Sequence, residues 1–145
     1  MKETYEGGEQ MLISESDWTM EYNIYHWGPL LFKVTIRPSD VESLKKIANK
    51  ATENWSENLA GIIKDERSID QTEYTKIIKP YLKAYQQAYK TWYGLDLTDI
   101  QTTAAWVNFM KKGESNPPHI HHNCHLSSVL FLDIPEPIKE EQKNW

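Results

Sequence analysis

The stretch from Asn116 to Phe131 reads NPPHIHHNCHLSSVLF, and its interpretation decides the fold. It holds four of the five histidines of the chain within seven residues and runs directly into an apolar segment. Imidazole is the commonest metal-binding side chain. A His-x-His pair on a strand directs both rings to one face, because side chains alternate with period two. We therefore predict that His119 and His121 bind a metal ion; the plainer alternative is two histidines hydrogen-bonded in a loop.

Other residues of this stretch carry weaker signals. His122 is expected to face solvent, because it follows His121 directly and points the other way. His125 could bind metal or substrate, but a surface position is at least as reasonable. Cys124 could join a soft metal site, although lone cysteines usually behave as small inert side chains.

Chain length, net charge and cysteine count limit the classes to which this protein can belong. The 145 residues suit one domain. A net charge of -5 and a pI near 5.5 argue against a nucleic-acid surface. The sequence has neither an apolar run long enough to cross a membrane nor a signal peptide. The single cysteine excludes an internal disulfide, so we expect a cytoplasmic protein, in the host cytoplasm if a phage encodes it.

The first half of the chain predicts an arm, a strand and a helix. Residues 1–20 are polar without a sustained period, so we expect a flexible N-terminal arm, and Met20 is a candidate alternative start. Residues 23–36 form extended chain around a Gly28-Pro29 turn, with Phe32, Val34 and Ile36 on one face. A helix then begins at Ser39 or Asp40 and ends near Trp55.

The second half predicts another helix and two strands. Residues 69–94 carry an aromatic stripe that favours core packing, with Pro80 in the first turn or at a kink and Gly94 at the C-cap. Residues 104–110 and 127–134 are strand candidates. The order of elements indicates an α+β fold with helices outside a largely antiparallel sheet. The last strands would leave a sheet edge open, so we expect that the fold is incomplete here and that edge pairing favours a homo-oligomer.

Several motifs resemble one family. They are Trp106-Val107-Asn108, Gly113-Glu114-x-Asn116, His119-x-His121, the segment Leu126 to Leu132, and the opening Tyr25 to Phe32. Together they resemble the 2-oxoglutarate/Fe(II)-dependent oxygenase superfamily, with the nearest match in a subgroup from phages and marine bacteria. The resemblance spans residue 22 to the C-terminus.

The resemblance implies a partial double-stranded β-helix (jelly roll) with supporting N-terminal helices, formed by an incomplete oxygenase-like domain over residues 21–145. It also implies Fe(II) held by two histidines and a carboxylate, with 2-oxoglutarate as cosubstrate. The side-chain amides of Asn108 and Asn116 are candidates to bind the cofactor or to brace the histidine loop.

Two features depart from the family pattern. The family motif is His-x-Asp or His-x-Glu, whereas this chain has His119-Ile120-His121, and an all-histidine site would suit Fe(II), Zn(II) or Cu(II). After Phe131 nothing matches the family's distal histidine or its 2-oxoglutarate-binding Arg or Lys, which indicates a truncated chain. We therefore predict a 2-oxoglutarate/Fe(II) oxygenase of the hydroxylase type whose substrate the sequence does not identify. The alternatives are a non-catalytic jelly-roll binding or assembly protein and a cupin-like all-histidine metalloprotein.

Overall fold

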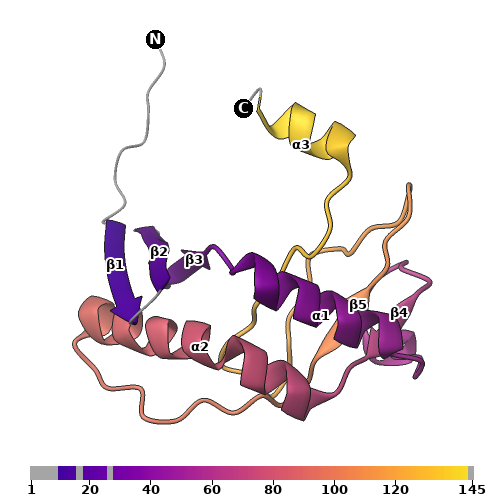
Figure 1. The fold of residues 1–145 in the computed structure, drawn as a ribbon. Helices are drawn as coiled ribbons and strands as arrows, with labels where there is room; N and C mark the ends of the chain where they lie inside the picture. The colour runs from indigo at the N-terminus through magenta and orange to yellow at the C-terminus, as the bar shows by residue number, and fades with distance from the viewer. Residues whose placement is uncertain (1–9, 16–17, 26–27, 144–145) are drawn as a thin grey trace. The chain divides into compact units, whose positions relative to one another are not determined.

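The computed structural model describes residues 10–15, 18–25 and 28–143 (Figure 1). The chain divides into two compact units. The first contains residues 1–40 and 75–102, and the second contains residues 41–74 and 103–145.

The first unit contains a three-stranded antiparallel sheet. Its strands are β1 (Gln10–Glu15), β2 (Trp18–Tyr25) and β3 (Leu31–Val34), in that order. Ile13 lies opposite Met20, so the candidate alternative start falls inside a paired strand. Residues 10–15 and 18–20 of the predicted flexible arm are therefore strand, because β1 pairs along its whole length with β2. Residues 1–9 lie outside the described part, and the domain boundary stays a prediction.

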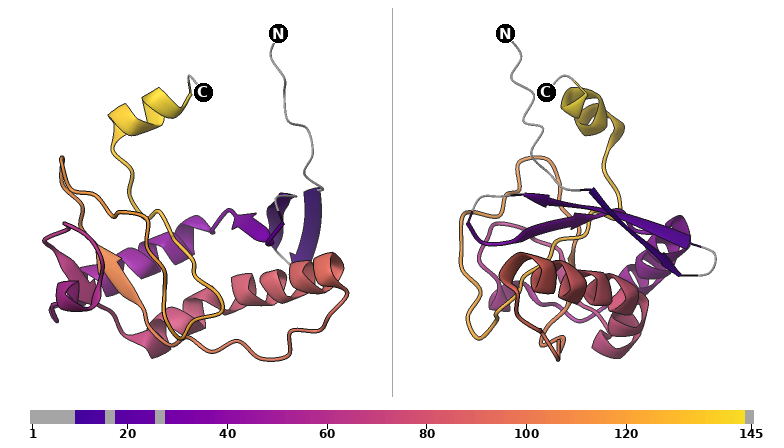
Figure 2. Two further views of the ribbon diagram at one scale, coloured as in Figure 1. Left: turned by 180° about the vertical axis from the view of Figure 1, so that it is seen from behind. Right: turned by 90° about the vertical axis from the view of Figure 1, so that its left-hand side faces the viewer.

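The sheet of the first unit packs against helix α2 (Gln71–Tyr93) as a second layer (Figure 2). Leu30, Phe32 and Val34 pack against the fully buried Ala88, and the ring of Phe32 meets that of Tyr85 edge-on at 5.8 Å. Exposure alternates along β3, with Phe32 and Val34 half-buried. This confirms the predicted apolar face of the strand.

Helix α2 confirms most of the second predicted helix. It begins after Asp70, whose carboxylate oxygen Oδ1 accepts a hydrogen bond from the Glu73 N–H at 2.8 Å, as an N-cap does. The predicted stripe is core, because Ile78, Tyr81, Ala84 and Ala88 are buried. Gly94 has φ +67° and ends the helix, as predicted.

Pro80 does not lie in the first turn of α2, which was one of the two predicted positions. We expected Pro80 in the first turn or at a kink, but it lies in the interior of an otherwise continuous helix. The Asp70 cap starts the helix well before Pro80. The proline therefore removes one backbone N–H donor from the helix rather than marking its start.

A three-residue cluster ties the start of helix α1 (Pro38–Lys50) to α2. The Tyr81 hydroxyl donates to Asp40 Oδ2 at 2.6 Å and accepts from the Arg37 backbone N–H at 3.0 Å. Arg37 Nε also donates to the same carboxylate oxygen at 2.9 Å. Burial raises the pKa of Tyr81, so the hydroxyl keeps its proton at neutral pH.

Helix α1 begins at Pro38, just before the predicted start at Ser39 or Asp40, and ends at Lys50 rather than near Trp55. The residues beyond it pair with strand β4 (Glu66–Ser68) instead. Trp55 N–H donates to the Glu66 carbonyl at 2.8 Å, and Ser68 N–H donates to the Glu53 carbonyl at 3.0 Å. Pairing with β4 therefore replaces the last predicted helical turn.

The second unit contains most of α1, the short 3-10 helix η1 (Ser56–Asn58), and the antiparallel pair β4 and β5 (Trp106–Asn108). It ends with α3 (Glu136–Gln142). The predicted strand 104–110 is thus confirmed only at its centre. The predicted strand 127–134 is wrong: it is not a regular strand, because it has no partner strand among the described residues. The exposure of its side chains still alternates, because Leu130, Leu132 and Ile134 are less exposed than their neighbours.

Helices and small antiparallel sheets together are compatible with the predicted α+β class. The double-stranded β-helix stays a prediction. In the described part of the chain, no helix combines the length and the apolar character needed to span a bilayer.

The Tyr81 cluster predicts a specific loss of stability. Tyr81→Phe should lower the free energy of unfolding by about 1–2 kcal/mol, because it removes a donor from Asp40 and an acceptor from Arg37 in a partly buried position. Urea denaturation measures this change. Tyr89→Phe is the matched control, because Tyr89 lies outside this cluster. Equal losses in the two variants would contradict the role of the cluster.

Candidate metal centre

The register between β4 and β5 organises the second unit. Ile69 N–H donates to the Ala105 carbonyl at 3.1 Å, and Phe109 N–H donates to the Asp65 carbonyl at 2.9 Å. In an antiparallel pair, hydrogen-bonded and non-hydrogen-bonded positions alternate. Glu66 and Asn108 are register partners one step from the second bond, so they form a non-hydrogen-bonded pair, whose side chains come close together.

Strand alternation therefore defines two faces of the β4–β5 pair. We call one of them the Glu66 face; it carries Glu66, Ser68, Trp106 and Asn108. Asp65 and Arg67, the neighbours of Glu66 in the sequence, point to the opposite face. One strand thus separates two adjacent carboxyl groups into different surroundings.

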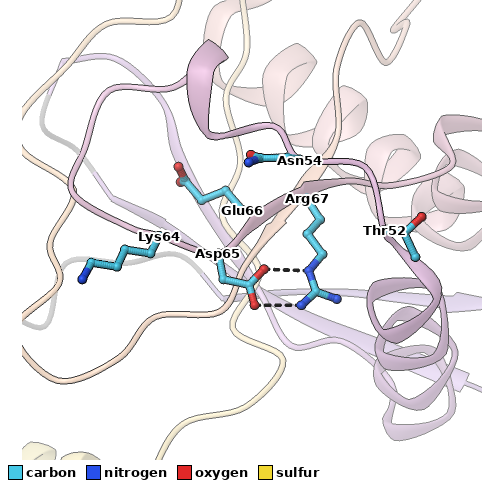
Figure 3. A pocket seen from close by; sticks show the side chains of 6 residues that line it. All are labelled: Thr52, Asn54, Lys64, Asp65, Glu66 and Arg67. Atoms are coloured by element: carbon cyan, nitrogen blue, oxygen red, sulfur yellow. Dashed lines mark hydrogen bonds and ion pairs between the residues drawn. The ribbon is translucent and has the colours of Figure 1, made fainter.

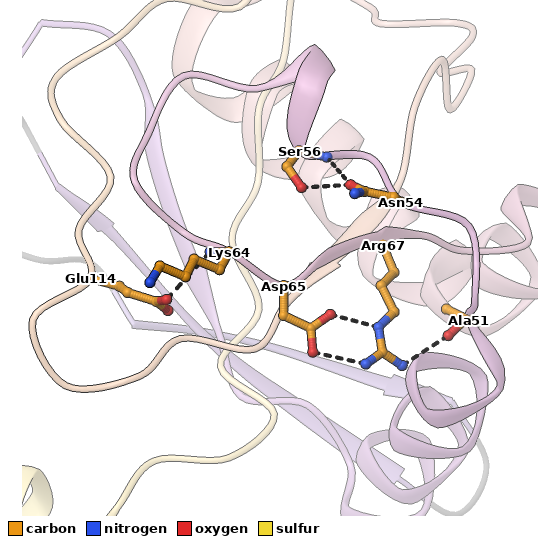
Figure 4. Close-up of polar contacts among 7 residues, drawn as sticks. All are labelled: Ala51, Asn54, Ser56, Lys64, Asp65, Arg67 and Glu114. Carbon is orange, nitrogen blue, oxygen red and sulfur yellow. Dashed lines mark hydrogen bonds and ion pairs between the residues drawn. The ribbon is translucent and has the colours of Figure 1, made fainter.

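The opposite face holds a compact ion pair (Figure 4). Arg67 Nε and Nη2 donate to the two carboxylate oxygens of Asp65 at 2.6 and 2.8 Å, and Nη1 donates to the Ala51 carbonyl at 3.1 Å. The guanidinium also lies over the Phe109 ring, 4.8 Å from its centroid. These contacts hold the Asp65 pKa below its ordinary value through the hydrogen bonds from Arg67.

A polar pocket of about 320 Å³ lies at this end of β4. Figure 3 shows the Asp65 and Arg67 side chains turned toward each other, while the Glu66 side chain points away from them. The pocket is lined by Thr52, Asn54, Lys64, Asp65, Glu66 and Arg67.

Glu66 and Asn108 carry buried oxygen atoms without partners. The Glu66 side chain is 2% exposed. Neither Glu66 Oε1 nor Asn108 Oδ1 accepts a hydrogen bond within the described part of the chain. Burial raises the pKa of Glu66, and the carboxylate of Glu114 raises it further. Two adjacent buried acceptors without donors are costly for the fold, so they need an explanation.

The two predicted ligands converge. His119 Nε2 and His121 Nε2 lie 3.2 Å apart, with the rings edge to face and 4.8 Å between centroids. Two nitrogens about 2.0–2.1 Å from one metal ion, at angles of about 90–110°, are roughly 2.8–3.4 Å apart. The separation of the two imidazoles is therefore the separation that a shared metal requires.

A hydrogen bond fixes which His119 nitrogen is free for a metal. His119 Nδ1 lies 2.8 Å from the Pro117 carbonyl, which can only accept, so we assign the ring proton to Nδ1. His119 Nε2 then presents a lone pair, and His121 Nε2–H donates to it in the metal-free chain. A backbone carbonyl that holds the second ring nitrogen is the usual support of a metal-binding histidine.

The histidine pair is placed beside the Glu66 face by Trp106. The ring of Trp106 lies 5.8 Å from that of His121. Ser128, farther along the same loop, hydrogen-bonds the hydroxyl of Tyr74, whose pKa is raised by burial. The loop therefore has contacts on β5 and at the start of α2, although residues 115–129 are all exposed.

Asn116 lies at the entry to the histidine loop, against Gly61. A Cβ atom at Gly61, where φ is +151°, would lie 3.2 Å from Asn116 Oδ1. Ile62 N–H also donates to the Ser115 carbonyl at 3.1 Å. This position favours the bracing role for Asn116, and its role in cofactor binding stays a prediction.

Other candidate residues do not join the pair. Cys124 Sγ donates to the Leu126 carbonyl, and His122 and His125 are exposed. Among the described residues, no three His, Cys, Asp or Glu side chains already lie close enough to share a metal ion. His26, the fifth histidine, lies outside the described part.

Sequence reasoning missed Glu66. The run Lys64-Asp65-Glu66-Arg67 is charged throughout and favours a solvated loop. Only period-two alternation, applied to so short a strand, would have directed Glu66 inward. A strand of three residues has too few alternating positions to identify its buried face without the register against Asn108.

Two convergent imidazoles held by a short loop are donor chemistry suited to a transition metal. Comparison with known families is more specific: residues 104–144 match the family described as "Putative 2OG-Fe(II) oxygenase". Over these residues the chain is similar to that family, and the match confirms the predicted resemblance to the 2-oxoglutarate/Fe(II) oxygenase superfamily for β5 and the histidine loop. No curated protein and no solved structure matches the chain.

The Asn116–Gly61 contact predicts an unequal cost for two glycine substitutions. Gly61→Ala should lower the free energy of unfolding by about 1–3 kcal/mol, because it strains the backbone and displaces Asn116. Gly113→Ala is the control: its φ is +86°, but its Cβ would meet nothing within 4 Å. Chemical denaturation compares the two, and a cost at Gly61 no larger than that at Gly113 would refute the contact.

The raised pKa of Glu66 predicts a pH-dependent gain on neutralisation. A carboxyl group whose pKa is higher in the folded state makes folding less favourable as pH rises above its unfolded pKa. Glu66→Gln should therefore raise the melting temperature at pH 7, and the gain should vanish below about pH 4, where the carboxyl is protonated in both states. Thermal melts across this range test it, and a pH-independent difference would contradict the assignment.

Proposed function

We propose that this protein is a 2-oxoglutarate/Fe(II)-dependent oxygenase of the hydroxylase type. The observation that carries the proposal is the convergence of His119 and His121 to 3.2 Å within the segment that matches the oxygenase family. The family match supports the oxygenase assignment, and the geometry supports metal binding by this pair.

The donor chemistry fits Fe(II) as part of a site. Imidazole suits iron, zinc and copper, and a non-haem Fe(II) site uses two histidines and a carboxylate. His119 and His121 would supply the two imidazoles, with His119 oriented by the Pro117 carbonyl. Fe(II) with bound 2-oxoglutarate would supply the oxidising chemistry that hydroxylates a C–H bond.

The protein side chains would orient and shield these groups. Asn108 would contribute a cofactor-binding amide from the Glu66 face, two residues along β5 from Trp106. Trp106 would form an apolar wall beside His121. Asn116 would hold the loop through its contact with Gly61. The jelly-roll fold and association into a homo-oligomer are part of this proposal.

Anaerobic calorimetry tests the proposal directly. Fe(II) should bind the chain with micromolar affinity, and 2-oxoglutarate should bind only after the metal. His119→Ala/His121→Ala should lose metal binding by at least 100-fold, because both imidazole donors are removed. His122→Ala/His125→Ala is the matched control, because it removes two neighbouring exposed imidazoles but leaves the pair intact.

The other outcomes separate the rival functions. Metal binding without 2-oxoglutarate binding would favour a cupin-like all-histidine metalloprotein. No metal binding would favour a non-catalytic binding or assembly protein. Equal losses in the two double variants would show that the loop binds metal through scattered imidazoles rather than through the pair.

A further inference from the structure

The proposed metal site has two imidazoles, and the described residues nearby add no third ligand in place. A carboxylate is the donor that a two-histidine Fe(II) site lacks. A carboxyl group that is buried without a cationic or hydrogen-bonding partner would be a candidate for this missing ligand.

Glu66 is such a group. It is 2% exposed, and its Oε1 has no hydrogen-bond partner. The neighbouring carboxyl group, Asp65, is instead neutralised by two hydrogen bonds from Arg67. The strand therefore buries one carboxyl group unpaired and pairs the next one.

The position of Glu66 relates it to the histidine pair. It shares the Glu66 face with Trp106, and the Trp106 ring contacts that of His121. The oxygen of Asn108, also without a partner, lies directly across the strands. A carboxylate and an amide oxygen are donors for divalent cations, and both here lack another partner.

The histidine loop is held near its two ends, where Ile62 N–H donates to the Ser115 carbonyl and Ser128 hydrogen-bonds the Tyr74 hydroxyl. Between these ends its residues are exposed and its hydrogen bonds are local, such as His119 to Pro117. A shift of this middle part toward β4 and β5 would leave both end contacts in place.

We propose that Glu66 is the carboxylate ligand of the metal held by His119 and His121, engaged when the histidine loop closes onto the Glu66 face, with Asn108 beside it. This inference rests on the proposed metal function. Binding would give the buried Glu66 carboxylate a cationic partner, and any proton that the group carries would be released to solvent. The burial that raises the pKa of Glu66 also makes its carboxylate costly to leave unpaired.

Cobalt(II) alone is a suitable probe, because its visible absorption reports the ligand set. Glu66→Gln should weaken cobalt(II) binding by at least tenfold and change the absorption spectrum, while it raises the melting temperature of the metal-free chain. A residue that is merely buried would give only the second effect. Glu57→Gln, an exposed carboxyl group in η1 of the same unit, is the control and should change neither.

Infrared difference spectroscopy gives a second readout. Cobalt(II) should shift a carboxylate stretching band in the wild type but not in Glu66→Gln. Should Glu66→Gln fail to fold by circular dichroism, Glu66→Asp keeps the charge, shortens the reach and should also weaken binding.

The results separate this inference from the proposed function. Wild-type cobalt(II) affinity and spectrum in Glu66→Gln, with binding lost in His119→Ala/His121→Ala, would overturn the Glu66 assignment and leave the histidine site standing. Unchanged binding in the double histidine variant, or no binding by the wild type, would overturn both.

Discussion

The register of β4 against β5 is the constraint on which the candidate site depends. Two backbone hydrogen bonds, Ile69 to Ala105 and Phe109 to Asp65, fix this register. A shift of β4 by one residue would move its side chains to the other face relative to β5. Glu66 would then leave the face that carries Trp106 and Asn108, and Arg67 would take its place there. Three residues per strand thus determine which side chains share a face with Trp106, the ring beside His121.

This register also separates two carboxyl groups that are adjacent in the sequence. Asp65 has a cationic partner that lowers its pKa, whereas burial and the charge of Glu114 raise the pKa of Glu66. Local electrostatics would favour exchanging them, so that the paired acid is the buried one. The backbone alternation does not allow that exchange. A buried acid without a partner is therefore a consequence of the strand geometry, and it is retained at a cost to stability.

Much of the fold was predictable because its signals are local and repeated. The aromatic stripe of α2 and the alternation of β3 both extend over enough residues to be unambiguous, and the Gly94 cap has a direct conformational reason. The incorrect secondary-structure predictions share one cause, which is that strand formation depends on a partner strand. Residues 10–15, 18–20 and 51–55 lack a strong pattern of their own, and their structure comes from pairing with other strands. Residues 127–134 show the converse, because a good strand pattern without a partner strand gave no ladder.

The candidate site divides in the same way. The His119–His121 pair could be proposed from spacing alone, because side chains two positions apart in extended chain point to the same side. Glu66 could not, because it lies more than fifty residues away and only pairing with Asn108 gives it a direction. The pair itself converges on a loop rather than on the strand that the spacing suggested. The Pro117 carbonyl orients His119, and His119 in turn accepts from His121, so side-chain hydrogen bonds replace the missing ladder. A cation that joined the two imidazoles would add two further bonds to this loop. If the pair binds a metal as we propose, metal binding and the ordering of this segment would therefore be coupled.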